Sequence, residues 1–550
     1  MTGLAVRPSI AQGQAMRSDD RPWRWSARLL AISVLVPLAV ILGSWLYFDP
    51  QVWSHLGSTV LPRLLLNTTS LIVGVGVGTL LLGVPLAWLT VMCEFPGRRI
   101  LDWALMLPFA LPAYVLAFVF VGVLDFAGPV QSGARALFGL PPAWSFEVRN
   151  TFGVIAVMTL VLYPYVYMLA RVSFTGQGQS TYEAARSLGL GPWAAFFRVS
   201  LPMARPGIVA GLSLALMEAL ADFGAVSVFN FDTFTTAIYK AWFGFFDLHS
   251  AAQLASILLT IVLVAMLVER HFRDRARFTE SGRNGVQRRI RLTGRLALGA
   301  SAFGWGVFVL AFAAPVVRLA SWAWGAAEDL DGRYLDLFLH TLSLGAMAGI
   351  LTVAAAFVLA YAHRYHGDYS TALSVRVGML GYALPGSVLA VGVMLSLTWF
   401  DNRMADGMEW LTGRDIGLVL SGTVIALLMA YFARFLAVAY GPVESSLERI
   451  RPSMRDAARS LGAGQWETVW RVYLPMLRPG LLTAGLLVLV DVMKEMPATL
   501  LLRPFGWDTL AVRIFELTSE GEWERAALPA VGLLLVGLVP VVLLVRKSGR

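Results

Sequence analysis

The chain contains twelve long runs of apolar residues, and each run is long enough to cross a lipid bilayer. A helix needs about 20 residues to cross the hydrocarbon core. Helices are expected because lipid offers no partners to free backbone groups. The runs lie at residues 29–48, 69–92, 101–124, 152–170, 206–227, 251–268, 296–317, 342–361, 377–399, 417–433, 479–498 and 526–545. We therefore predict an all-α polytopic membrane protein.

The composition excludes the other broad classes of chain. Apolar residues make up 57% of the 550 residues and charged residues 14%, whereas soluble domains carry about 25% charged residues. The chain therefore lacks the charges for a soluble shell. The single cysteine, Cys93, excludes an intrachain disulfide. The six histidines are scattered, so we expect no structural metal site.

The basic residues predict the orientation of the spans. With the N-terminus in the cytoplasm, the inside segments hold 32 of the 44 lysine and arginine residues, as expected of a membrane protein. Nine arginines fall within residues 269–295. A DNA-binding arm could be equally basic, but the topology explains the bias by itself. Residues 1–28 are expected to form a cytoplasmic tail before a retained first span, because no cleavage pattern follows that span.

The two halves of the chain repeat each other with a period of 273 residues. Ala-Leu-Pro at 110–112 recurs at 383–385, and 16 of 25 positions are identical between 183–207 and 456–480. Each half holds six spans, an even number, so both copies have the same orientation. They are therefore expected to be related by a pseudo-twofold axis along the membrane normal.

The repeat and the spans together divide the chain into five predicted parts. These are a cytoplasmic tail (1–28), a first six-span domain (29–268), a basic cytoplasmic linker (269–295), a second six-span domain (296–545) and a cytoplasmic end (546–550).

The loop between the fourth and fifth spans is long in both halves, at 171–205 and 434–478. In the first copy we expect a short helix at 181–188, broken by Gly189. A second short helix is expected at 193–200, where prolines end it and start the next span. An amphipathic turn on the membrane surface would explain one such loop. Two loops at the same place in the repeat favour a docking element.

The amino-acid sequence of this loop resembles a known signature. It reads Glu-Ala-Ala, three residues, Gly, nine residues, then an aliphatic residue, any residue and Leu-Pro at 183–202. It is similar to the signature loop of permease subunits in binding-protein-dependent ABC importers of the type I fold. The second copy departs only by Asp456 in place of Glu, which keeps the carboxylate. The resemblance covers about 500 residues and implies a bacterial cytoplasmic (inner) membrane protein with both termini in the cytoplasm.

The resemblance implies roles for the loop residues and for partner proteins. The loops would form coupling helices that insert into grooves on two cytoplasmic ATPase subunits. A periplasmic or lipid-anchored solute-binding protein would deliver the cargo. The residues implied in coupling are Glu183, Ala184, Ala185, Gly189, Asp456, Ala457, Ala458 and Gly462.

No ATP-binding loop is found in this chain. A Walker A loop needs Lys followed by Ser or Thr. Only Lys547, of three lysines, precedes a serine, and Arg546 stands where glycine is required. We therefore expect no cofactor and no catalytic residue here, with ATP and Mg²⁺ held by the separate ATPase chain.

The fused halves resemble ferric-iron permeases and, less closely, thiamine permeases. The stretches 217–224 and 494–500 carry the closer resemblance to the iron permeases. A permease for thiamine, polyamine or another small solute is the alternative within this class. An ATP-independent secondary transporter is disfavoured, because it has no ATPase to dock. A membrane enzyme is disfavoured because no nucleophile–base pair stands out.

Four carboxylates are predicted inside the spans. Glu218 and Asp222 are four residues apart and therefore on one helix face, and Asp491 and Glu495 occupy the equivalent positions at +273. Carboxylates within a membrane face the protein interior or a water-filled path. They could line a cation pathway, since hard oxygen ligands suit Fe(III), Mg²⁺ or polyamines. Alternatively they are structural, with Lys494 neutralising one of them.

A second recurring pair lies on the outer side. Asp232-Thr233 recurs as Asp508-Thr509, among several aromatic residues. These residues are either part of an interfacial aromatic belt or contacts of a gate with the binding protein.

Overall fold

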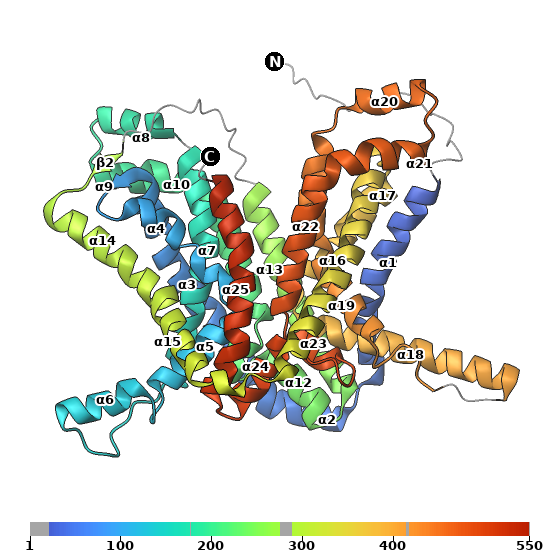
Figure 1. Ribbon diagram of the computed structural model, residues 1–550, viewed down its shortest axis with the longest axis horizontal. Coiled ribbons are helices and arrows are strands. Elements are labelled where there is room, and N and C mark those ends of the chain that lie inside the picture. The colour runs from blue at the N-terminus through green and yellow to red at the C-terminus, as the bar shows by residue number, and fades with distance from the viewer. Residues whose placement is uncertain (1–20, 177, 275–288, 414–416, 549–550) are drawn as a thin grey trace.

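The computed structural model describes residues 21–176, 178–274, 289–413 and 417–548. Long helices run side by side through the molecule (Figure 1). Within the described residues, eleven helices are long and apolar enough to cross a membrane, or twelve when one strongly bent pair counts as a single span. The predicted all-α class with about twelve spans is therefore confirmed.

Thirteen α-helices and one short strand belong to the first half of the sequence. They are α1 (Arg21–Gly43), α2 (Pro50–His55), α3 (Leu61–Met92), β1 (Cys93–Glu94), α4 (Arg98–Ala104), α5 (Ala113–Leu124), α6 (Pro129–Phe138), α7 (Thr151–Gly176), α8 (Gly178–Ser187), α9 (Pro192–Ala195), α10 (Leu201–Ala221), α11 (Gly224–Val228), α12 (Phe234–Tyr239) and α13 (Leu248–Asp274).

The second half repeats most of this order, with the single helix α18 at the place of α5 and α6. It contains β2 (Ile290–Arg291), α14 (Gly294–Phe308), α15 (Ala314–Gly325), α16 (Gly332–His366), α17 (Tyr369–Gly378), α18 (Gly386–Thr412), α19 (Val424–Glu448), α20 (Pro452–Ser460), α21 (Gln465–Thr468), α22 (Leu474–Lys494), α23 (Pro497–Leu502), α24 (Leu510–Ser519) and α25 (Trp523–Ser548).

The short helices mark the two ends of the molecule. In Figure 1, α8 and α20 lie at one end, and α2, α6, α12 and α24 lie at the other. These are called below the α8/α20 end and the α12/α24 end.

The third span of each half is broken, which corrects the continuous spans predicted at 101–124 and 377–399. Leu111 and Leu384 are extended, with φ/ψ of −93°/125° and −93°/136°. The cause is the proline that follows each of them, because proline excludes the helical conformation from the residue before it. In the second half the chain direction bends by 118° between the segments Tyr369–Ala383 and Gly386–Thr412. The repeated Ala-Leu-Pro motif is therefore the break itself.

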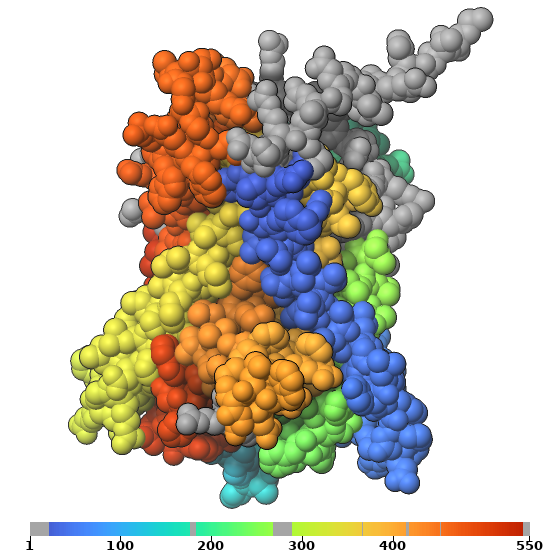
Figure 2. Space-filling view, turned by 90° about the vertical axis from the view of Figure 1, so that its right-hand side faces the viewer, coloured from blue at the N-terminus to red at the C-terminus, as the bar shows by residue number. Residues whose placement is uncertain are grey.

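The outermost spans are exchanged between the two halves. α1, from the first half, packs against α16, α17 and α18 of the second half, and α15, from the second half, packs against α5 of the first half as well as against α25. Figure 2 shows α1, in blue, lying across the yellow and orange surface of the second half. Of the two hydrophobic cores, one joins α1, α12 and α13 to the second half, and the other joins α14, α15, α24 and α25 to the first. Each packed unit therefore draws helices from both predicted domains.

Aromatic and polar contacts fix this exchange at the α8/α20 end. The Trp23 ring lies 4.4 Å from that of Tyr361 and 5.1 Å from that of Trp466. Arg28 donates a 2.8 Å hydrogen bond to the hydroxyl of Ser370. The two halves therefore cannot separate without breaking buried contacts of α1.

A continuous helical path joins each signature loop to the following span. α9 runs through a π-helical turn at Phe196–Ser200 into α10, and α21 runs through Val469–Tyr473 into α22. The prediction that proline ends the short helix before the span was wrong. Pro202 sits in the first turn of α10, where its missing N–H matters little because the preceding turn has the wider π hydrogen-bond pattern.

The linker returns beside the end of the second span. Ile290 pairs with Cys93 in a short parallel ladder, and Arg291 pairs with Glu94. The second half therefore begins on the same side as the end of α3. Residues 275–288 of the predicted linker lie outside the described part of the chain.

Candidate functional site

The two signature loops fold in the same way at the α8/α20 end. Each forms a short helix, α8 or α20, that stops at a glycine with positive φ: Gly189 at 89° and Gly462 at 86°. The Leu190 N–H donates to Ala185 O at 3.2 Å, and the Ala463 N–H donates to Ala458 O at 3.0 Å. These bonds form the glycine-dependent helix end in which a left-handed residue turns the chain back.

The exposed face of each short helix carries the carboxylate. Glu183 and Asp456 are exposed, as are the alanines that follow them, Ala184 and Ala457. The next alanines, Ala185 and Ala458, are buried. The three positions of the Glu-Ala-Ala motif therefore differ in environment. The carboxylate and the first alanine face outward, and the second alanine packs the short helix onto the protein.

Large apolar side chains are exposed in the same two loops. Leu188 is 85% exposed and its counterpart Leu461 89%. Four aromatic residues at matching positions are also exposed: Trp193, Phe197, Trp466 and Trp470. Clustered apolar exposure of this kind marks an interaction surface, and its presence on both halves indicates two equivalent surfaces.

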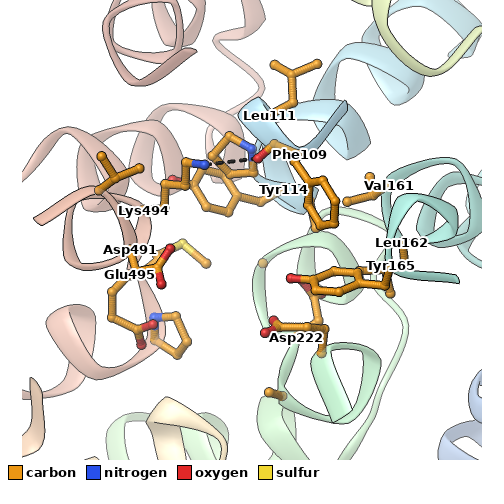
Figure 3. Close-up of a pocket in the computed structure, with 18 of the residues that line it drawn as sticks. Phe109, Leu111, Tyr114, Val161, Leu162, Tyr165, Asp222, Asp491, Lys494 and Glu495 are labelled. Atoms are coloured by element: carbon orange, nitrogen blue, oxygen red, sulfur yellow. Dashed lines mark hydrogen bonds between the residues drawn. The ribbon is translucent and has the colours of Figure 1, made fainter. Parts of the chain in front are cut away.

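A cavity of about 360 Å³ lies between the halves (Figure 3). Its walls come from both repeats, and all four predicted carboxylates line it, Glu218 and Asp491 from α10 and α22 and Asp222 and Glu495 from the residues that directly follow these helices. In Figure 3, Tyr165 and Asp222 lie on one side, and Asp491 and Glu495 lie across from them. The structure therefore brings the predicted quartet together around one space.

Two of the four carboxylates cap helix breaks. The fifth span was predicted to be helical to 227, but α10 ends at Ala221 and leaves Asp222 extended. Glu495 is likewise extended after α22, because Pro497 cannot continue a helix. Asp222 accepts a hydrogen bond from the Val226 N–H at 3.1 Å.

Glu495 accepts a hydrogen bond from the Ala498 N–H at 3.2 Å. The prediction that each carboxylate pair lies on one helix was therefore wrong for Asp222 and Glu495.

The other two carboxylates have no such role. Glu218 and Asp491 lie one helical turn earlier and line the cavity. Within the described residues neither of them forms an ion pair or a hydrogen bond. The quartet therefore divides into a capping pair, Asp222 and Glu495, and an unpaired pair, Glu218 and Asp491.

Arg434 is a cavity residue that sequence reasoning missed. Its Nε lies 3.3 Å from Oε2 of Glu495, and both side chains are largely buried. The tenth span was predicted to end at residue 433, but α19 continues to Glu448. A Cβ at Gly386 would lie 2.2 Å from Oε1 of Glu495, so only glycine leaves room for this pair. The apolar pattern resumes after Arg434, and this could have indicated that the span continues past residue 433.

Lys494 forms no ion pair with Glu495 within the described residues, and the alternative that it neutralises one of the four carboxylates stays a prediction. Its Nζ donates a 3.0 Å hydrogen bond to Phe109 O in the other half. Arg434 and Lys494 correspond to Val161 and Ala221 in the first repeat. The cavity is therefore asymmetric, with four carboxylates and two cations, and carries an excess of negative charge when all six groups are ionised.

An aromatic cluster of Phe223, Tyr239 and Phe515 joins the halves next to the cavity. The Phe223 ring lies 5.2 Å from that of Tyr239 and 5.4 Å from that of Phe515. Phe223 follows the capping residue Asp222 and also lines the cavity. This cluster, called here the aromatic gate, lies on the α12/α24 side of the carboxylates.

The predicted outer pairs, Asp232-Thr233 and Asp508-Thr509, lie beside this gate. The threonine and the aspartate of each pair have different contacts. Thr233 and Thr509 are buried N-caps of α12 and α24, so their side chains hold helices rather than face a partner. Asp232 pairs with Lys240, and Asp508 pairs with Arg503. Contact with a binding protein therefore stays a prediction for the two aspartates.

The fold and the site define a class of protein. Two repeated six-span halves enclose a charged cavity that lies next to an aromatic cluster, and two matched surfaces with exposed apolar residues lie at the α8/α20 end. This is the architecture of a transport permease. The family described as "Binding-protein-dependent transport system inner membrane component" matches residues 79–278 and 352–548. The chain belongs to this family and is a multi-pass inner-membrane protein.

Individual relatives cover the chain to different extents. A "Fe(3+)-transport system permease protein FbpB 2" of Haemophilus influenzae is 29% identical over 88% of this chain and 90% of its own length. A "Ferric transport system permease protein FbpB" of Actinobacillus pleuropneumoniae is 23% identical over 94% of this chain and 76% of its own. A "Molybdenum transport system permease protein ModB" of Escherichia coli is 30% identical over 34% of this chain and 82% of its own.

Proposed function

We propose that the chain is the membrane-spanning subunit of an ATP-driven importer of ferric iron. The observation that carries this proposal is the central cavity, with its excess of carboxylates and its unpaired Glu218 and Asp491. Hard oxygen donors suit Fe(III). The two full-length relatives named as ferric permeases support the same cargo.

In this proposal the α8/α20 end faces the cytoplasm, and both termini lie there too. Two copies of an ATPase dock on the matched surfaces around Glu183 and Asp456 and hold the ATP and Mg²⁺. A solute-binding protein delivers iron at the α12/α24 end. Glu183 and Asp456 form charge-assisted contacts with basic groups of the ATPase, and Ala184 and Ala457 permit close approach.

The continuous helices supply the mechanical link. The helical paths 192–221 and 465–494 run from the docking surfaces to the cavity. Each path is 30 residues long, which corresponds to about 45 Å at 1.5 Å per residue. Phe223 and the capping carboxylates follow directly at their far ends. Movement of α8 and α20 by the ATPases would therefore shift the carboxylates and the aromatic gate together.

Alternating access follows from this arrangement. When the gate is closed, the cargo has no route to the outer side. Drawing the docking ends together would part Phe223 from Phe515 and open the cavity to the binding protein. Glu218 and Asp491 then hold the cation during transfer, while Arg434 and Lys494 keep that binding weak enough for release.

The test is stimulation of ATP hydrolysis in a reconstituted assembly. The permease, its cognate ATPase and the cognate binding protein are placed in nanodiscs. The ATPase rate is then measured with the binding protein empty, loaded with Fe(III), or supplied with thiamine, spermidine or molybdate. We expect Fe(III) alone to raise the rate. Stimulation by another solute but not by Fe(III) would show that the importer carries that solute and not iron, while the assignment as an ATP-driven importer would still hold.

A further inference from the structure

Each half carries an additional helix that points away from the bundle at the α12/α24 end. In the first half it is α6, and in the second it is the last part of α18, residues 399–412. These two segments, called here the outer helices, occupy equivalent places in the repeat, since 129–138 corresponds to 402–411. Figure 1 shows both projecting sideways, across the direction of the spans.

The polar side chains of α6 are used internally. Gln131 is fully buried and donates to Leu124 O at 2.8 Å and to Phe146 O at 2.9 Å. Arg135 donates to Phe126 O at 2.7 Å and to Trp144 O at 3.1 Å. These bonds tie α6 to the chain that precedes it, at Leu124 and Phe126, and to the loop that follows it, at Trp144 and Phe146.

The apolar side chains of α6 are left on the surface. Leu137 is 79% exposed and Phe138 71%, and Val130 is exposed on the same helix face. A helix in water would be expected to show the opposite arrangement.

The outer part of α18 repeats this design. Asp401 is fully buried and accepts hydrogen bonds from the backbone N–H groups of Leu420 and Ser421. Phe400, Met408 and Leu411 share one helix face and are exposed. The opposite face is polar and exposed, with Asn402, Asp406 and Glu409.

We propose that the apolar faces of both outer helices rest in the lipid headgroup region of the outer membrane leaflet. An amphipathic helix with Phe, Leu and Trp on one face and polar residues on the other is suited to that position. Both helices point away from the midline of the molecule (Figure 1), and in the proposed function cargo enters at that midline. The end of α15 lies on the same side of the molecule as α6 (Figure 1), and its Trp324 is also exposed. A soluble binding protein seated over the gate would not reach these lateral faces.

The consequence is mechanical. Two lateral helices held in the outer leaflet would keep the outer part of each packed unit at a fixed depth. The units could then rock about that level while the α8/α20 end moves. This role is independent of which solute is carried.

The experiment measures the immersion of single spin labels in the full-length permease. Cys93 is replaced by alanine, the variant is reconstituted in phospholipid nanodiscs, and a nitroxide is attached at Leu137→Cys or Leu411→Cys. Matched controls on the polar sides are Ser132→Cys and Glu409→Cys, which lie on the same two helices. Collisions with oxygen, which concentrates in lipid, are compared with collisions with a water-soluble nickel chelate.

We expect oxygen to relax the labels at 137 and 411 more strongly than the nickel chelate does, with the reverse order at 132 and 409. Equal nickel access at all four positions would overturn the proposal, because the helices would then lie in water. Exclusion of both reagents at 137 and 411 would also overturn it, because protein and not lipid would cover the faces. Quenching of a bimane at the same positions by brominated lipid gives a second readout with the same two outcomes.

Discussion

Replacing Glu495 by glutamine should lower the stability of the permease, whereas replacing Glu218 by glutamine should lower transport. Glu495 and Arg434 form an ion pair with side-chain exposures of 5% and 12%. Removing one partner of a buried pair costs about 3–5 kcal/mol, because the other charge is left unpaired. Glu218 lines the same cavity but has no ion pair to lose within the described residues.

The assay heats each purified variant in detergent and measures the fraction that stays monodisperse by size-exclusion chromatography. Glu495→Gln should aggregate at a lower temperature than wild type, and the double variant with Arg434→Met should recover much of the loss. Glu218→Gln should keep the wild-type profile and show reduced uptake in vesicles. The reasoning is refuted if Glu495→Gln is as stable as wild type, or if Glu218→Gln is the less stable of the two.

Three further predictions concern the ends of the molecule. Glu183→Lys combined with Asp456→Lys should reduce co-purification of the ATPase, since each change removes a charge-assisted contact of about 1.5–3 kcal/mol; an unchanged ATPase yield, equal to that of a Glu409→Lys control, would contradict docking at α8 and α20. In a Cys93→Ala background, Phe505→Cys should react with an impermeant maleimide added to intact cells and Leu461→Cys should not, and the reverse result would invert the orientation. Native Cys93 is unsuited to this test because burial raises the pKa of its thiol to about 11, so that it stays protonated and unreactive at neutral pH. Phe515→Ala should raise ATP hydrolysis without the binding protein, because it removes two aromatic gate contacts worth about 0.5–1.5 kcal/mol each; an unchanged basal rate would exclude Phe515 from the gate.

The sequence predicts most of the architecture because its signals are local and repeated. Apolar length locates the spans, and the 273-residue period locates the two halves. The glycine that ends each docking helix is also predictable, since a left-handed residue is needed at that helix end. Gly189 confirms this expectation, and its counterpart Gly462 has the same conformation.

The exchange of spans could not be predicted in this way. The apolar face of α1 is equally compatible with either half, and contacts made only in the folded chain, such as those of Trp23 with Phe357 and Tyr361, hold it against the second. Chain connectivity alone would have placed α1 beside α3.

The site was predicted in part. The spacing of four residues brought Glu218 near Asp222, and the repeat brought Asp491 near Glu495, but helix periodicity does not show where a helix stops. Pro497 was the available signal for the break in the second half. Arg434 was missed because a charged residue next to an apolar run was taken as the end of the span, although a buried carboxylate elsewhere can hold it there.

The most direct test of the account is ATP-dependent accumulation of radioactive ⁵⁵Fe(III) in vesicles that contain the complete importer. Uptake and ATP hydrolysis are measured on the same preparation for wild type and for Glu218→Gln combined with Asp491→Asn. The account predicts that wild type accumulates iron only with ATP and the binding protein, and that the double variant hydrolyses ATP but loses most of the uptake. Normal iron accumulation by a well-folded double variant would contradict the central claim that these two carboxylates carry the cargo between the halves.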